Sequence, residues 1–274
     1  MTVRGALTEG ATALERAGCP SPGVDAEWLL AHVLGVSRTE LHALPPELAE
    51  RDVDRFRALV ARRASREPLA YILGEWGFRR LTLAVDPRVL IPRPETETVV
   101  ERCLALLAGV DVPLVLDVGV GSGAIALAIA DERPDAQVVA TDVSPGALAV
   151  AEENRRRASV DGRVRFVRGD LSAGETGPFD LVVSNPPYVA PDELASLEPE
   201  LLFEPRAALV GVGGHEAVAC AALETLAPGG ALVLEVGDGQ APSVERLLEE
   251  LGFAEVAISA DLAGRERVVE GRRP

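Results

Sequence analysis

The stretch Leu114–Ala130, LVLDVGVGSGAIALAIA, decides the fold of this 274-residue chain. Its apolar start predicts a buried strand, and its alanine- and leucine-rich end predicts a helix. A glycine-rich turn lies between them, where the backbone can pass close to a ligand. Strand, turn and helix together predict the first half of a nucleotide-binding βαβ unit. The predicted binding turn reads G-x-G-x-G and comprises Gly119, Val120, Gly121, Ser122 and Gly123.

Two further strands are predicted to carry polar groups to the same sheet edge. Residues 137–141 form an apolar strand that ends in Asp142, and residues 164–167 lead to Asp170 and Leu171. An acid at the first position can accept hydrogen bonds from two ribose hydroxyls. A carboxylate followed by an apolar side chain can hold an adenine by its amino group and its face. Each acid alone could be a helix cap or a solvated charge, but the ordered set favours a ligand site on a doubly wound, mostly parallel α/β sheet.

The fourth strand, residues 179–184, runs into Asn185-Pro186-Pro187-Tyr188. Two consecutive prolines fix two φ angles and remove two backbone donors. The result is a stiff rim of carbonyl acceptors with one carboxamide and one aromatic face. Such a rim suits a planar amino group, as in a glutamine side chain, adenine or cytosine. The alternative is an ordinary strand-ending turn, because Asn-Pro commonly starts turns; the nucleotide-binding pattern before it favours the functional interpretation.

Charge and composition limit the classes of molecule that the chain is expected to bind. The net charge is −16, and all 27 basic residues are arginine. Residues 1–70 hold nine arginines against ten acidic residues, whereas residues 71–274 hold eighteen against thirty-three. The contrast predicts two modules. The strong negative charge argues against a nucleic-acid partner, which is bound through basic side chains.

Targeting and metal signals are absent from the sequence. No apolar run is long enough for a membrane span, and the first residues do not form a signal peptide. The three cysteines and three histidines show no metal-ligand spacing. We therefore expect a cytoplasmic protein with no metal and no membrane partner.

The N-terminal module is predicted to be helical. Apolar residues recur at helical spacing in four segments, which lie around residues 7–17, 24–34, 38–44 and 49–65. Trp28 and Phe56 are predicted core residues. The segment from Pro68 to Val85 is rich in glycine, aromatic and alternating residues, which predicts a β-hairpin connector. A proline-punctuated loop, residues 91–97, then opens a helix that runs to residue 107, and its acids suit ordinary helix capping.

Several motifs, in this order, resemble those of the bacterial peptide chain release factor glutamine methyltransferases, the PrmC/HemK family. They are REPLAYILG at 66–74, IPRPETE at 91–97, the glycine turn, SNPPY at 184–188, FEP at 203–205 and LEVG at 234–237. Asp261, Gly264 and Arg267 resemble the closing pattern of that family. Two departures are Val120, where relatives commonly have a small polar residue, and Leu171, where some have an aromatic. The resemblance spans nearly the whole chain.

The resemblance implies a seven-stranded, Rossmann-like class I methyltransferase sheet with a small all-α N-terminal domain joined by a β-hairpin. The implied domains are residues 1–67 for substrate recognition, 68–90 for the hairpin linker and 91–274 for methyl transfer. The implied reaction moves the methyl group of S-adenosyl-L-methionine to the side-chain nitrogen of glutamine in the Gly-Gly-Gln motif of class-I release factors. S-adenosyl-L-homocysteine is the second product, and the modification acts in translation termination.

The same resemblance assigns roles to the predicted site residues. Asn185, Pro186 and Tyr188 would be catalytic, and with Pro187, Arg93 and Glu95 they would bind the substrate. The cofactor would contact the turn from Gly119 to Gly123, together with Asp142, Asp170, Leu171 and Asn185. Two other functions share the NPPY turn or the fold: adenine amino-methylation of DNA or RNA, and non-catalytic binding of the cofactor. We expect a monomer whose protein partner is a release factor.

Overall fold

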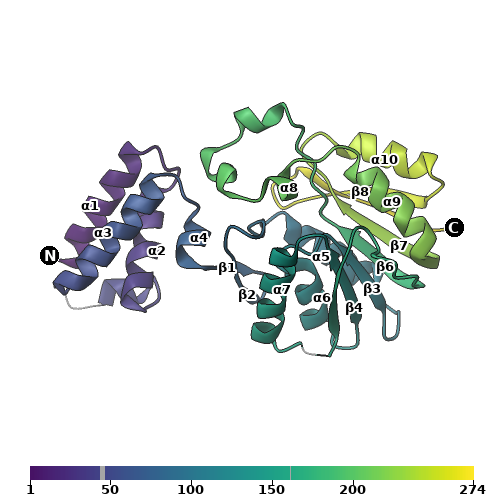
Figure 1. The fold of residues 1–274 in the computed structure, drawn as a ribbon, viewed down its shortest axis with the longest axis horizontal. Coiled ribbons are helices and arrows are strands. Elements are labelled where there is room, and N and C mark those ends of the chain that lie inside the picture. The colour runs from purple at the N-terminus through teal and green to yellow at the C-terminus, as the bar shows by residue number, and fades with distance from the viewer. Residues whose placement is uncertain (44–46, 161) are drawn as a thin grey trace. The chain divides into compact units, whose positions relative to one another are not determined.

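The computed structural model describes residues 1–43, 47–160 and 162–274, and its chain divides into two units. Residues 1–74 and 198–203 form the first, here called the helical unit. Residues 75–197 and 204–274 form the second, the sheet unit. Figure 1 shows the helices and strands of both.

The helical unit is built from amphipathic helices around one apolar cluster. Its elements are α1 (Val3–Arg16), α2 (Pro22–Leu34), a 3-10 turn (Glu40–Ala43), α3 (Glu50–Ala64), α4 (Leu69–Leu73) and a second 3-10 turn (Pro199–Phe203). Phe56 is fully buried there with Leu14, Leu29 and Leu30. The buried residues of α1 and α3 lie on one face of each helix, and charged residues lie on the other faces. Burial of the apolar faces therefore holds the helices together.

Three local predictions for this region were wrong in part. Trp28 is 39% exposed instead of buried, because the core side of α2 is filled by Leu29 and Leu30. The Arg38 guanidinium lies 5.3 Å from the Trp28 ring centroid and stacks over it. The predicted third helix is a 3-10 turn over Glu40–Ala43, with residue 44 outside the described residues. The predicted hairpin begins only after Gly74, because residues 69–73 form α4.

The sheet unit contains the seven-stranded, mostly parallel sheet that was predicted. Its strands are β3 (Leu114–Val118), β4 (Gln137–Asp142), β5 (Val164–Arg168), β6 (Phe179–Ser184), β7 (Leu226–Glu235), β8 (Ala254–Ala260) and β9 (Glu266–Arg272). They are arranged β5-β4-β3-β6-β7-β9-β8. Strands β3 to β7 are parallel, and β9 is antiparallel to both β7 and β8. The hairpin of β1 (Glu75–Phe78) and β2 (Leu81–Ala84) forms a separate small sheet.

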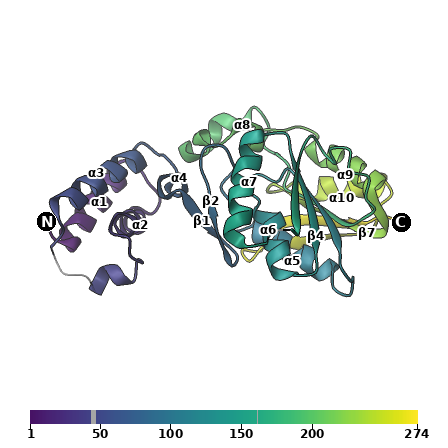
Figure 2. The same cartoon turned by 60° about the horizontal axis from the view of Figure 1, so that its bottom comes forward.

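Helices cover both faces of the large sheet. Contacts place α5 (Thr96–Leu106), α6 (Ala124–Glu132) and α7 (Pro145–Ala158) on one face, and α9 (Gly214–Thr225) and α10 (Ala241–Glu250) on the other. Figures 1 and 2 show these two groups on opposite sides of the strands. All seven residues of α6 from Ala124 to Ala130 are buried, as its uniformly apolar sequence requires.

The order of the strands fixes where a ligand can bind. The chain goes from β3 outward to β4 and β5, then returns to the other side of β3 with β6. Open α/β sheets bind ligands at the carboxyl ends of the strands where this order reverses. The turns after β3 and β6 meet at that point, and they are the glycine turn and the NPPY turn. The described residues contain no helix long and apolar enough to cross a membrane.

Candidate active site

A cavity of about 400 Å³ lies at the carboxyl ends of β3, β4 and β6 in the sheet unit. Most of the residues predicted for the site line it: Arg93, Gly119, Val120, Gly121, Ser122, Asp142, Asp170, Leu171, Asn185, Pro186 and Pro187. Three predicted residues, Glu95, Gly123 and Tyr188, are not part of its lining. The structure thus brings four separate turns of the chain to one cavity.

The glycine turn leaves room for a ligand. Gly119 and Gly121 have φ values of +80° and +54°, where a side chain would be strained. A Cβ atom added to either would meet no described atom within 4 Å. The N–H groups of Gly119 and Val120 both donate to the Thr141 carbonyl at 2.9 Å, which fixes the turn on β4. Gly123 instead packs against Leu127 at the start of α6.

Asp142 joins the glycine turn to the next strand end. One carboxylate oxygen accepts the Gly121 N–H at 3.0 Å, and the other accepts the Ser144 N–H at 2.8 Å. Each oxygen keeps a further lone pair, so the carboxylate can still accept two hydroxyl hydrogens. The position and the free acceptors fit the ribose of a nucleoside.

Asp170, Leu171 and Val143 lie beside Asp142 on the cavity wall. The Leu171 backbone has a φ of +47°, and its carbonyl accepts the Thr141 hydroxyl at 2.6 Å. Val143 is 58% exposed, although it is a large apolar residue on a structured turn. The apolar side chains of Val143 and Leu171 can pack on the faces of a base, and the Asp170 carboxylate can accept a hydrogen bond from its amino group. Sequence reasoning missed Val143, whose signal was its place directly after Asp142.

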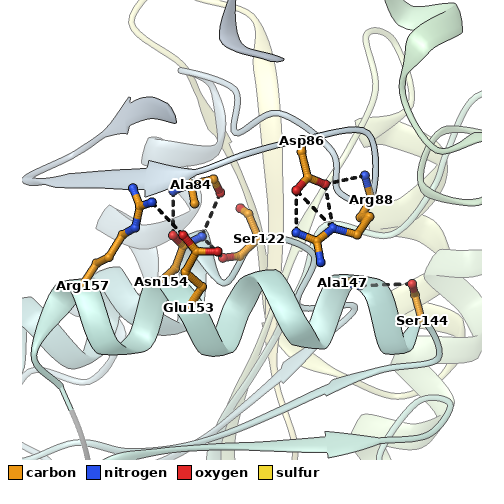
Figure 3. A network of polar contacts seen from close by, with 9 residues as sticks. All are labelled: Ala84, Asp86, Arg88, Ser122, Ser144, Ala147, Glu153, Asn154 and Arg157. Atoms are coloured by element: carbon orange, nitrogen blue, oxygen red, sulfur yellow. Dashed lines mark hydrogen bonds and ion pairs between the residues drawn. The ribbon is translucent and has the colours of Figure 1, made fainter. Parts of the chain in front are cut away.

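A buried asparagine supports the glycine turn from α7 (Figure 3). The Asn154 side chain accepts the Ala84 N–H at 2.6 Å and donates to the carbonyls of Ala84 at 3.0 Å and Ser122 at 2.8 Å. All of its polar atoms are satisfied in a fully buried position. Further along α7, near Gly146, Arg88 pairs with Asp86 through two nitrogens and lines the cavity. Neither Asn154 nor Arg88 was predicted.

The NPPY turn follows β6, the strand next to β3, and its residues Asn185, Pro186 and Pro187 line the cavity. Ser184, at the end of β6, donates its hydroxyl to the Val118 carbonyl at 2.7 Å and so joins the two strand ends. Tyr188 does not line the cavity, and the Gln240 side-chain amide donates to its backbone carbonyl at 3.0 Å. Burial raises the pKa of Tyr188 to about 12. The ring is therefore a neutral phenol at physiological pH.

Two glycines let a second segment pack tightly on the prolines of this turn. A Cβ atom on Gly211 would lie 2.6 Å from the Pro187 carbonyl oxygen, and one on Gly214 would lie 3.2 Å from the Pro186 Cβ. The two segments are also tied by backbone hydrogen bonds, from the Val189 N–H to Leu209 and from the Gly211 N–H to Val189. The turn is thus held from outside as well as by its own prolines.

We expect Gly211→Ala to impair the site more than the fold. The added methyl group would clash with backbone, which cannot rotate away, so the NPPY turn must shift by some tenths of an ångström. Small misplacement of reacting groups lowers rates strongly. The expected result is a kcat loss of about tenfold or more with a melting temperature within a few degrees of the wild type. Gly77→Ala is the matched control, because a Cβ there meets no described atom within 4 Å and Gly77 does not have a positive φ. Equal kcat values for Gly211→Ala and the wild type would contradict this account.

The loop at residues 91–97 is anchored by Glu204, the acid of the FEP motif. The Glu204 carboxylate accepts the Ile91 N–H at 3.0 Å and pairs with the Arg93 guanidinium. The Glu204 side chain is only 2% exposed, whereas that of Arg93 is 29% exposed. Because one oxygen of Glu204 holds the backbone and the other holds Arg93, the motif fixes this cationic side chain on the cavity wall.

Two buried acids lie near the carboxyl ends of β3 and β7. Burial raises the pKa of Asp117 to about 7, and one of its oxygens has no partner among the described residues. Burial also raises the pKa of Glu235 to about 7, whereas Thr96 and Asn185 lower it. Perturbed acids cluster at functional sites. The described residues contain no group of histidine, cysteine and acidic side chains suited to a metal ion.

Comparisons with known proteins agree with this geometry. The family model described as the PrmC N-terminal domain matches residues 5–74, and the methyltransferase small domain matches residues 105–261. The release factor glutamine methyltransferase of Deinococcus radiodurans is 43% identical over 100% of this chain and 99% of its own length.

Two further matches bear on family and fold. The enzyme of the same name from Burkholderia pseudomallei is 46% identical over 93% of each chain. A solved structure, the T. Thermophilus 16S rRNA N2 G1207 methyltransferase in complex with AdoMet and guanosine, shares the fold at 21% identity. Its TM-score is 0.55, over 73% of this chain and 50% of that one. By sequence over its whole length, this chain belongs to the release factor glutamine methyltransferase family.

Proposed function

We propose that this protein transfers the methyl group of S-adenosylmethionine to the side-chain nitrogen of the glutamine in the Gly-Gly-Gln motif of class-I release factors. The observation that supports it most is the Asn-Pro-Pro rim, which lines the same cavity as the glycine turn. The family to which the chain belongs carries this activity in its name.

The cavity residues fit S-adenosylmethionine. The open space at Gly119 and Gly121 accommodates a chain that passes close to the backbone. The free lone pairs of Asp142 suit the ribose, and Asp170, Leu171 and Val143 suit the adenine. When bound, S-adenosylmethionine supplies an electrophilic methyl group on a sulfonium centre.

The residues of the NPPY turn would orient the glutamine side chain that accepts the methyl group. An amide nitrogen is a weak nucleophile because its lone pair is delocalised into the carbonyl. The Asn185 side-chain oxygen and the Pro186 carbonyl would accept its two hydrogens, which aims the nitrogen along the line of transfer. Both oxygens also stabilise the positive charge that develops on nitrogen. The neutral Tyr188 ring would cover the amide plane.

The helical unit is proposed to recognise the body of the release factor. Within this unit Glu200 is held by Arg63 at 2.9 Å and by Arg66 at 2.5 Å, which orders the segment 198–203. Leu202 and Phe203, two adjacent apolar residues of that segment, are 64% and 40% exposed. Such side chains suit contact with a protein surface.

One assay tests both parts of the proposal. Purified protein is incubated with tritiated S-adenosylmethionine and three acceptors: intact release factor, the same factor with the motif glutamine replaced by alanine, and a short Gly-Gly-Gln peptide. We expect incorporation into the intact factor, none into the alanine variant, and a much higher KM for the peptide. Equal labelling of the alanine variant would refute the proposed acceptor, and an equal KM for peptide and factor would refute the docking role.

A further inference from the structure

Glu235 ends β7 directly beside the NPPY turn. In the parallel pairing of β6 with β7, Ser184 lies opposite Leu234. The next residue on each strand is therefore Asn185 on one side and Glu235 on the other. Glu235 is 2% exposed, so its carboxyl group lies in the protein interior.

The Glu235 carboxyl group has two polar side chains next to it. The Thr96 hydroxyl donates to one oxygen at 2.6 Å, and Thr96 is itself buried at the start of α5. The side chain of Asn185 lies next to this carboxyl group, because Asn185 and Glu235 directly follow the paired residues Ser184 and Leu234, and Asn185 is one of the groups that lower the pKa of Glu235. Glu235 of the LEVG motif and Thr96 of the IPRPETE motif are thus hydrogen-bonded to each other next to Asn185, which is proposed to hold the substrate.

This contact decides which way the Asn185 amide points. An ionised carboxylate only accepts hydrogen bonds, so Asn185 must offer its NH2 group to Glu235. Its oxygen is then left to accept a hydrogen from the substrate. Without the carboxylate, the amide could turn by 180° and present a donor to the substrate amide, which needs an acceptor. A charged partner also polarises the amide and makes its oxygen a stronger acceptor.

We propose that Glu235 is a positioning residue, which fixes the Asn185 amide through its NH2 group so that the oxygen faces the substrate. The inference rests on the proposed function, because it assumes that Asn185 accepts a hydrogen from the substrate glutamine. Thr96 supports it by holding the other carboxylate oxygen.

The proposal implies that activity depends on the ionisation of Glu235. The pKa of Glu235 is raised to about 7: burial is the main cause and the charge of Glu95 adds to it, whereas the Thr96 hydroxyl, Arg267 and Asn185 lower it. The other groups nearby are the neutral Tyr188 and His215, whose ring nitrogen bonds the Glu235 backbone carbonyl at 2.9 Å. Since the ionised form is the one that orients Asn185, kcat should rise with pH through about 7 and then level off.

The experiment compares Glu235→Gln and Thr96→Val with the wild type. Glutamine keeps the shape but can donate to the Asn185 oxygen, so kcat should fall about tenfold to a hundredfold, with little change in S-adenosylmethionine affinity. The rise of kcat near pH 7 should disappear. Thr96→Val removes a hydrogen bond to the ionised form, so it should keep the rise but move it to higher pH. A merely structural role would lower the melting temperature and leave the pH profile unchanged.

A second readout does not depend on turnover. The side-chain amide resonances of Asn185, assigned by their loss in Asn185→Ala, should titrate near pH 7 in the wild type and stay constant in Glu235→Gln. If the Asn185 resonances titrate but the wild-type protein does not methylate release factor, the proposed function is refuted and the contact between Asn185 and Glu235 is still supported. Resonances that do not titrate, or wild-type kcat in Glu235→Gln, would overturn the positioning role.

Discussion

Asn185→Ala is expected to lower kcat for methyl transfer by about 100-fold or more, by analogy with other lost hydrogen bonds to a transition state. The substitution removes an acceptor that aims the substrate nitrogen and stabilises charge that forms during transfer. It leaves the glycine turn and Asp142 untouched, so S-adenosylmethionine affinity should change much less. Single-turnover rates and calorimetric binding, measured on the same preparation, separate the two effects. An unchanged rate, or a loss of affinity as large as the loss of rate, would contradict this role.

Asn185→Asp is the matched variant, and the contact with Glu235 determines its behaviour. A second carboxyl group beside a buried one cannot ionise freely, so the pair is expected to share one proton near neutral pH. The shared proton lets residue 185 keep an oxygen toward the substrate. We therefore expect activity between that of the wild type and that of the alanine variant. Activity below that of Asn185→Ala would mean that this oxygen is not presented to the substrate.

Asp142→Ala is expected to weaken S-adenosylmethionine binding by about 1.5–3 kcal/mol, the range for hydrogen bonds to a charged group. At about 1.4 kcal/mol for each factor of ten, the affinity falls about tenfold to 150-fold. The structure adds a second cause, because the N–H groups of Gly121 and Ser144 also lose their acceptor. The ligand-free protein should therefore melt at a somewhat lower temperature.

Thermal shifts at subsaturating ligand measure this loss, since a ligand that binds the folded state raises its stability by mass action. Asp142→Asn is the control, because it keeps the shape and one acceptor and should bind with intermediate affinity. Equal shifts in the wild type and in Asp142→Ala would remove Asp142 from the ribose site.

Much of the fold follows from local sequence patterns. The apolar runs at 114–118 and 179–184 are buried strands because parallel strands are covered on both faces. The carboxyl ends of such strands share an edge, which is why the glycine turn, Asp142 and Asn185 could be expected together. Trp28 was misjudged because a single apolar residue on a helix does not reveal which of two adjacent faces the core occupies.

The supporting parts of the site could not be predicted in this way. Gly211 lies against Pro187, and Asn154 lies between Ala84 and Ser122, yet these residues are distant in sequence. Their roles arise from long-range packing, for which no local periodicity exists. Glu235 was visible only as part of a motif; its position beside Asn185 follows from the pairing of β6 with β7, and its hydrogen bond from Thr96 follows from the packing of α5.

The most direct test of the central claim is to locate the transferred methyl group when both kinds of acceptor compete. The protein is incubated with S-adenosylmethionine, a class-I release factor and adenine-containing DNA and RNA, and the products are analysed by peptide fragmentation and nucleoside mass spectrometry. We predict one added methyl group on the side-chain nitrogen of the Gly-Gly-Gln glutamine and no methylated adenine, and we predict that Asn185→Ala forms the methylated glutamine far more slowly. Methyl groups on adenine, or on another residue of the factor, would contradict the account.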